Sequence, residues 1–258
     1  MHGFTLIELA MVLFILALML GSFLTPLSVS LEQRDRKETT DKLEEIRESL
    51  IGYALVNGHF PCPDCLSTAT TADCAAGGLT INDGMEDGVD GGAGISPRTG
   101  NTYDSCATKA GNLPWVTLSV PENDGWGNHF IYRVTEEFAD DVDGTSVASC
   151  PNPAAGISFC LNSANDGDIN IKDDSDNDVA QNVPVVVVST GNNSLVAFAS
   201  LSANEQENLD NFNLATYTDT TFVSADFRQA AGTEFDDLLI WVSPSVLLYQ
   251  MVRAERLP

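Results

Sequence analysis

Residues 4–24 read FTLIELAMVLFILALMLGSFL, an apolar run of 21 residues with one charged side chain, Glu8. As a helix rising about 1.5 Å per residue, the run is roughly 31 Å long, close to the thickness of a bilayer core. A secretory signal peptide is shorter and begins with basic residues, and a buried core helix is rarely apolar on every face. The run therefore predicts a transmembrane helix over residues 4–25.

Glu8 is unusual inside this run, because an ionisable side chain in hydrocarbon is costly unless another group neutralises it. We expect its partner to be a cation on another chain. The alternative is a carboxylate that reaches the membrane surface near the end of an ordinary anchor.

The segment GFTLIEL, residues 3–9, resembles the processing site of type IV prepilins and type II secretion pseudopilins. The resemblance implies that residues 1–3 are a leader peptide, that a prepilin peptidase cleaves between Gly3 and Phe4, and that Phe4 is N-methylated. It also implies that Glu8 faces the Phe4 amine of a neighbouring subunit during filament assembly. The leader departs from the family pattern because it lacks the usual Lys or Arg.

Residues 26–57 continue the helix with a different pattern. Pro26 predicts a bend, and Asn57-Gly58 predicts the helix end. Between them, apolar residues recur at helical spacing among charged ones, at Leu43, Ile46, Leu50 and Tyr53 or Ala54. This pattern predicts an amphipathic stalk on a globular domain at 58–258. The mixed charges are either a solvated face or a means of registering neighbouring subunits.

The composition bears on partners and activity. Acidic residues outnumber basic ones 37 to 12, for a formal net charge of -25, and such a surface repels nucleic-acid backbones. The chain has three histidines and no G-x-S-x-G motif, zinc-binding histidine pair or phosphate loop. We therefore expect neither nucleic-acid binding nor an enzyme.

Six cysteines follow the predicted anchor, on the side expected to be oxidising: Cys62, Cys65, Cys74, Cys106, Cys150 and Cys160. Structural disulfides are favoured over a zinc site, which would need a second close pair, and over redox work, which would need a βαβ context. Six cysteines allow fifteen pairings. Closure of short loops favours Cys65–Cys74 and Cys150–Cys160, which leaves Cys62 for Cys106.

Two acidic stretches could bind a hard cation. The candidate ligands are Asp83, Glu86, Asp87 and Asp90 in the first, and Asp174, Asp176 and Asp178 in the second. Neither stretch has the Gly and Glu spacing of a hand-type calcium loop, so solvated acidic turns are the alternative. Some pseudopilins use calcium in a loop near the sheet, and calcium is the one cofactor that the resemblance suggests.

The rest of the chain predicts a β-rich domain. Runs rich in β-branched and aromatic residues at 129–135, 183–190 and 238–242 predict strands. Ser243-Pro244 predicts the start of a terminal helix that ends near residue 254, and 205–213 reads as a polar connector.

Residues 124–128, DGWGN, resemble a turn of major pseudopilins. Where that turn has a proline, this chain has Gly125. Trp115 and Trp126 are expected to pack in the core against the stalk. The predicted fold class is α+β and pilin-like: a long helix, half transmembrane and half amphipathic, on an antiparallel sheet with large disulfide-tied loops.

This resemblance implies a structural subunit, of the minor kind, in a type IV pilus or type II secretion filament. Its expected partners are other pilin or pseudopilin subunits, prepilin peptidase and the inner membrane. We expect a single-pass inner-membrane protein that becomes part of a periplasmic or cell-surface filament. The alternative is a tip-located binding module or adhesin that uses acidic loops at 62–106 and 136–182.

Overall fold

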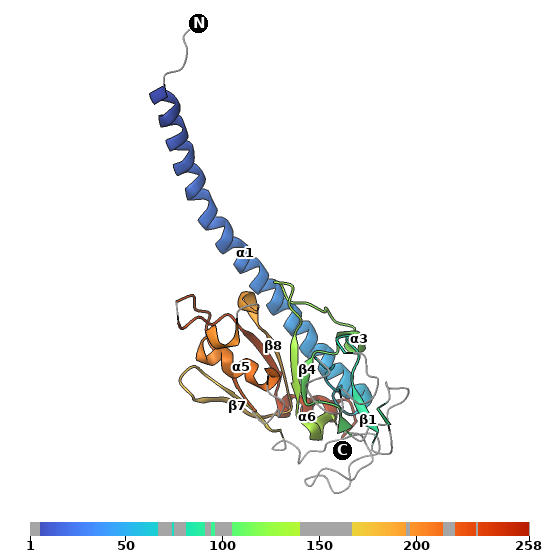
Figure 1. Ribbon diagram of the computed structural model, residues 1–258. Coiled ribbons are helices and arrows are strands. Elements are labelled where there is room, and N and C mark those ends of the chain that lie inside the picture. The colour runs from blue at the N-terminus through green and yellow to red at the C-terminus, as the bar shows by residue number, and fades with distance from the viewer. Residues whose placement is uncertain are drawn as a thin grey trace.

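The computed structural model describes residues 6–66, 74, 81–90, 94–95, 105–139, 167–194, 197–213, 220–230 and 232–257. Within these ranges the side chains at 17–28, 89–90, 94–95, 105 and 211–213 are not described. The chain is α+β, with a long N-terminal helix packed on antiparallel sheets (Figure 1).

Helix α1, Leu6–Asn57, is continuous through Pro26, so the prediction of one long helix ending at Asn57 is confirmed. Its N-terminal half projects away from the domain, and its C-terminal half lies across it (Figure 1). The docked half buries the predicted apolar stripe: Leu43, Ile46, Leu50 and Ala54. Gly58 ends the helix with a φ of 83°, and its N–H donates to the Ala54 carbonyl at 2.8 Å.

The central sheet has the strand order β10-β8-β5-β4, and all neighbours are antiparallel. Its strands are β4 (Ala110–Asn112), β5 (Ile131–Val134), β8 (Val185–Ser189) and β10 (Leu238–Val242). Val185 and Val187 pack in a core with α1 and helix α6 (Pro244–Arg253), whereas Val186 and Val188 pack on the opposite side. Burial of both faces explains why β8 reads as an uninterrupted apolar run.

The second core holds the sheet β7-β6-β9, in which β6 and β9 are parallel. Its strands are β6 (Ile169–Lys172), β7 (Asp178–Val183) and β9 (Thr221–Val223). A third sheet, β2-β1-β3, joins Gly94–Ile95, Gly88–Asp90 and Ser105–Cys106. Short helical segments are α3 (Trp115–Leu118), α4 (Glu136–Ala139), η2 (Gly191–Asn193) and η3 (Phe198–Ser200).

The expected polar connector at 205–213 is wrong, because helix α5 spans Ala203–Asn213. The helix begins with a reciprocal cap: the Ser202 N–H donates to Glu205 Oε2 at 3.0 Å, and the Glu205 N–H donates to Ser202 Oγ at 3.4 Å. Buried Asn208 then donates to the Val223 carbonyl and accepts from the Val223 N–H. A helix with so polar a sequence is therefore held by caps and tertiary hydrogen bonds.

Two of the three predicted disulfides lie in the described part of the chain and are confirmed. Cys62 is bonded to Cys106 across 44 residues, and Cys65 to Cys74 across nine. The predicted Cys150–Cys160 pair lies outside the described residues.

Candidate functional site

The first turns of the projecting half of α1, residues 6–16, hold more exposed large apolar side chains than any other described segment. Every large apolar side chain from Leu6 to Leu16 is between 48% and 87% exposed. Glu8 is exposed on the same segment, in the first turn of the helix. Gly3 and Phe4, the predicted cleavage and methylation site, lie outside the described residues. A surface this apolar marks an interaction site.

Among the described residues, no helix combines the length and the continuous apolar character needed to span a bilayer. The transmembrane helix at 4–25 stays a prediction, because residues 4 and 5 and the side chains at 17–28 are not described.

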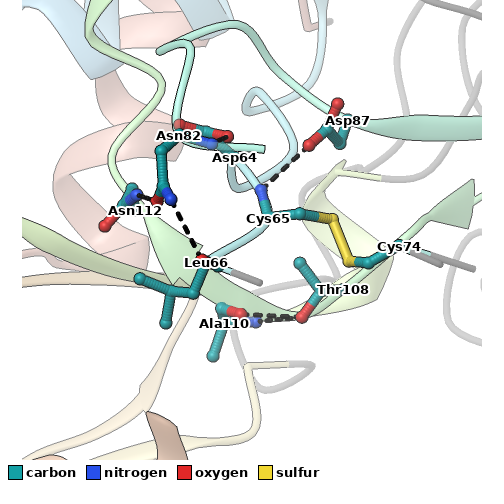
Figure 2. Close-up of a disulfide and its surroundings, with 9 residues drawn as sticks. All are labelled: Asp64, Cys65, Leu66, Cys74, Asn82, Asp87, Thr108, Ala110 and Asn112. Atoms are coloured by element: carbon teal, nitrogen blue, oxygen red, sulfur yellow. Dashed lines mark hydrogen bonds between the residues drawn. A yellow bond between two sulfur atoms is a disulfide. The ribbon is translucent and has the colours of Figure 1, made fainter. Parts of the chain in front are cut away.

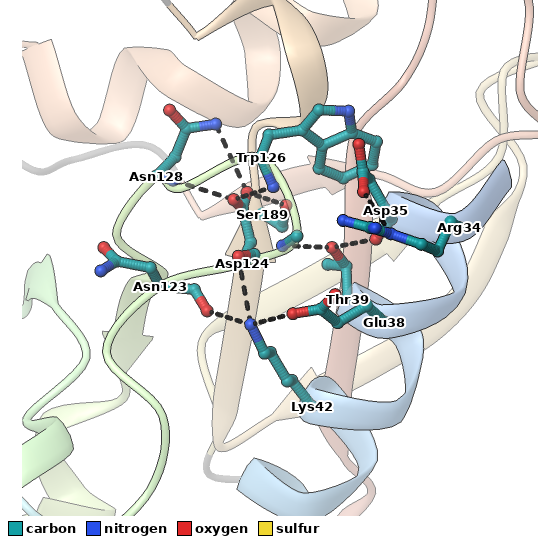
Figure 3. A network of polar contacts seen from close by, with 11 residues as sticks. Arg34, Asp35, Glu38, Thr39, Lys42, Asn123, Asp124, Trp126, Asn128 and Ser189 are labelled. Atoms are coloured by element: carbon teal, nitrogen blue, oxygen red, sulfur yellow. Dashed lines mark hydrogen bonds and ion pairs between the residues drawn. The ribbon is translucent and has the colours of Figure 1, made fainter. Parts of the chain in front are cut away.

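A polar network fastens the docked half of α1 to the DGWGN turn (Figure 3). The Lys42 ammonium donates to the carbonyls of Asn123 and Asp124 at 2.9 and 3.2 Å, and pairs with Glu38 at 2.8 Å. The Trp126 indole N–H donates to Glu32 at 3.2 Å. Trp126 therefore contacts the stalk, but its side chain is half-buried and not in the core that we predicted for it.

Asp124 builds the turn that makes these contacts. Its Oδ1 accepts the backbone N–H groups of Trp126 and Asn128, both at 2.9 Å, and its Oδ2 accepts the Ser189 hydroxyl at 2.7 Å (Figure 3). This buried carboxylate joins the turn to the end of β8. The stalk, the turn and the sheet thus form one hydrogen-bonded unit.

Gly125 brings the turn into direct contact with the stalk backbone. A Cβ added there would lie 2.2 Å from the Asp35 carbonyl oxygen. The Gly125 N–H donates to Thr39 Oγ1 at 2.9 Å, and Thr39 donates in turn to the Asp35 carbonyl. Trp115 contacts the His129 ring edge-to-face, with 5.0 Å between the ring centroids, and lies next to Gly84. It begins helix α3, which contacts the stalk, but its side chain is only half-buried.

Buried carboxylates organise the loop around the Cys65–Cys74 disulfide (Figure 2). Asp64 accepts the backbone N–H groups of Asn82 and Gly84, both at 3.0 Å, and Asp87 accepts the Cys65 N–H at 2.9 Å. Burial raises the pKa of Asp64 to about 7, and burial also raises the pKa of Asp87 to about 6. These groups therefore titrate near neutral pH and serve the loop as backbone acceptors.

Among the side chains that the structure describes, the predicted calcium ligands do not come together. In the second stretch, Asp174 pairs with Arg228 at 2.9 Å, Asp176 with Lys172, and Asp178 accepts from Gln181. In the first, Asp83 accepts the Met85 N–H and Asp87 the Cys65 N–H, Glu86 accepts the Tyr53 hydroxyl, and the Asp90 side chain is not described. Each described carboxylate thus has a separate local partner.

A different acidic set does converge within the described ranges. Glu205, Asp236 and Asp237 place one carboxylate oxygen each within 4.8 Å of one another, and they are the only such group among those residues. Glu205 comes from the cap of α5, and the two aspartates directly precede β10. The sequence signals for the group are the Ser202-x-x-Glu205 cap and the acidic pair before an apolar strand, neither of which predicts that they meet.

Two members of this acidic cluster are fully buried: Glu205 is 1% exposed and Asp237 is 3% exposed. Asp237 Oδ2 accepts from Asn208 at 2.8 Å, while the buried Asp237 Oδ1 has no hydrogen-bond partner among the described residues. Burial, and then the charges of Glu205 and Asp236, raise the pKa of Asp237 well above its ordinary value, and burial raises that of Asp236 to about 6. Three oxygen ligands with an unpartnered buried oxygen suit a hard divalent cation.

Comparisons with family models, curated proteins and solved structures found no match to this chain.

Proposed function

We propose that this chain is a prepilin-like structural subunit, a minor component of a type IV pilus or type II secretion filament, which assembles through its N-terminal helix. The observation that carries the proposal is the projecting, exposed apolar segment Leu6–Leu16 of α1, which contains Glu8 and overlaps the GFTLIEL motif of residues 3–9. An apolar surface of this size favours burial in lipid or against other helices, because removal from water lowers its free energy.

In the proposed mechanism, a prepilin peptidase cleaves after Gly3 while the apolar segment lies in the inner membrane. The freed Phe4 amine of one subunit then meets the Glu8 carboxylate of its neighbour. In a low-dielectric surrounding an unpaired carboxylate is strongly unfavourable, so the pair selects subunits that are correctly placed along the filament. The contacts of Lys42, Thr39 and Trp126 would keep the globular domain attached to the stalk in the filament.

The test compares Glu8→Gln with Glu8→Asp in the organism that makes the chain. We expect Glu8→Gln to be membrane-bound and cleaved, yet reduced about tenfold in purified filaments, since losing one buried pairing costs at least ~1.4 kcal/mol. Glu8→Asp keeps the charge and should retain more incorporation. N-terminal peptide mass spectrometry should find methylated Phe4. Normal incorporation of Glu8→Gln, or a mature chain that begins at Met1, would overturn the proposal.

The same filaments separate this proposal from a binding module or adhesin at the tip. A subunit distributed along the fibre is recovered in a constant ratio to fibre length. A tip protein is recovered in trace amounts that follow the number of fibre ends.

A second proposal concerns the acidic cluster Glu205, Asp236 and Asp237. We propose that it binds a divalent cation such as Ca²⁺, which would hold the beginning of α5 against the beginning of β10. The unpartnered, buried Asp237 Oδ1 favours this reading. Millimolar calcium should then raise the melting temperature of the full-length protein in detergent, and replacement of Asp237 should abolish the increase.

A further inference from the structure

The solvent face of α1 carries a stripe of charged residues whose sign changes along the helix. Its members are Arg34, Lys37, Asp41, Glu45 and Glu48, at offsets of 0, 3, 7, 11 and 14, which align on one helix face. This charged stripe is opposite the buried stripe of Leu43, Ile46 and Leu50. The side chains of Arg34, Lys37 and Asp41 are 71%, 78% and 67% exposed, and Glu45 and Glu48 are also exposed.

The two ends of the charged stripe differ in how well they are paired. Lys37 contacts Asp41 at 3.0 Å, and Arg34 contacts its neighbour Asp35 at 3.3 Å. Glu45 and Glu48 form no ion pair or hydrogen bond with any described residue. Exposed pairs within one helix contribute only about 0–1 kcal/mol, so Arg34 and Lys37 can exchange their partners at little cost.

This arrangement discriminates between registers when two copies of the stalk lie parallel. With no offset, the basic ends of both stripes coincide, as do the acidic ends, and like charges repel. An offset of eleven residues is about 16 Å and close to three full turns, so the same helix face is presented. At that offset Arg34 of one copy lies beside Glu45 of the next, and Lys37 lies beside Glu48.

We propose that the charged stripe is an interface with a second copy of this chain, in which Arg34 and Lys37 of one stalk pair with Glu45 and Glu48 of the next. The occupant is a second copy because the spacing within each stripe matches the other at one shared offset, for both ion pairs together. The inference rests on the proposed function, since stalks anchored by the same end in a membrane assemble in parallel.

A zero-length cross-link tests the offset in wild-type filaments. A carbodiimide joins an amine only to a carboxylate in direct contact, and Lys37 and Glu48 of one helix are about 16 Å apart. A Lys37–Glu48 linked peptide can therefore form only between copies. We expect this link in filaments and its absence in detergent-dispersed monomer. The Lys37–Asp41 link, from a 3.0 Å contact within one copy, should form in both and serves as the internal control.

Charge reversal gives an independent measurement. Glu45→Lys with Glu48→Lys should reduce filament recovery about tenfold at low salt, because two attractive contacts become repulsive, and the loss should shrink at high salt. Adding Arg34→Glu and Lys37→Glu inverts both proposed ion pairs and should restore recovery. Asp178→Lys with Glu255→Lys changes the net charge by the same amount at exposed sites elsewhere and should leave recovery unchanged.

The outcomes separate this inference from the proposed function. Two results would overturn the proposed eleven-residue offset and leave the filament proposal standing. One is a filament in which Lys37 is linked to Asp41 but never to Glu48. The other is a charge-reversal variant that assembles like the wild type. Absence of the wild-type chain from any filament overturns both.

Discussion

The substitution Asp237→Asn should change the stability of the acidic cluster in a predictable direction. In the wild type, Asp237 Oδ2 accepts from Asn208, and its buried Oδ1 lies without a hydrogen-bond partner among the described residues, close to Glu205 and Asp236. Asparagine keeps a carbonyl oxygen for Asn208 and places an N–H donor at the position of Oδ1. It also removes one negative charge from a group of three. Without a cation, the variant should therefore be more stable than the wild type.

The magnitude follows from the unsatisfied buried atom, which costs about 1–3 kcal/mol in typical cases. For a chain of this size, such a gain raises the melting temperature by roughly 3–10 °C. Tryptophan fluorescence of the full-length protein in detergent, with a chelator present at pH 8, measures it. The gain should be larger at pH 8 than at pH 5, because the raised pKa of Asp237 makes its ionisation in the folded state unfavourable as the pH rises.

In the presence of calcium, the wild type should have the higher melting temperature of the two proteins. Calcium stabilises the wild type by binding only the folded state, whereas the variant has lost a charged ligand and should show little shift. Asp226→Asn, at an exposed aspartate, is the matched control and should change neither melting temperature nor calcium response. A variant that is less stable than wild type in chelator, or one that keeps the full calcium shift, would refute the reasoning.

Two further predictions concern the stalk and the disulfide loop. Gly125→Ala should lower the free energy of unfolding by about 1–3 kcal/mol, because its Cβ would meet the Asp35 carbonyl at 2.2 Å. Gly52→Ala, where nothing lies within 4 Å of the new Cβ, should instead raise it by about 0.5–1 kcal/mol in urea titrations, and equal effects at both sites would contradict the close approach. For the loop, the folded-state pKa values of Asp64 and Asp87 are raised to about 7 and about 6, so their contribution to stability is present below pH 4 and lost as the pH rises through 6 to 7. Urea midpoints should therefore fall between pH 5 and pH 8, and a rise over that range would show that these carboxyls are not buried as described.

The local sequence pattern predicts an element well where the spacing of its apolar residues, or a residue at its end, is enough to specify it. The stalk is such a case, since its apolar residues recur at helical spacing and Gly58 ends it. The strand at 238–242 and the helix that begins at Pro244 have the predicted bounds within one residue. Cys65 and Cys74 pair because so short a loop leaves few competing partners.

Elements held by distant partners escaped prediction. Helix α5 has a weak apolar pattern, and its stability comes from the Ser202–Glu205 cap and from Asn208 bonded to β9. The parallel pairing of β6 with β9 joins segments about fifty residues apart, which no local periodicity encodes. The predicted acidic sites each lie within a single stretch, whereas the acidic cluster combines Glu205 with residues some thirty positions later.

By itself the sequence determined where apolar side chains are concentrated: in the first half of the stalk, along the stripe that begins at Leu43, and in the valine run of β8. Burial of such side chains depends on composition and spacing, which are properties of the chain before it folds. Only the tertiary structure decided which charges meet. Electrostatic contacts depend on distance and local polarity, and these exist only once α5, β10 and the stalk occupy their places.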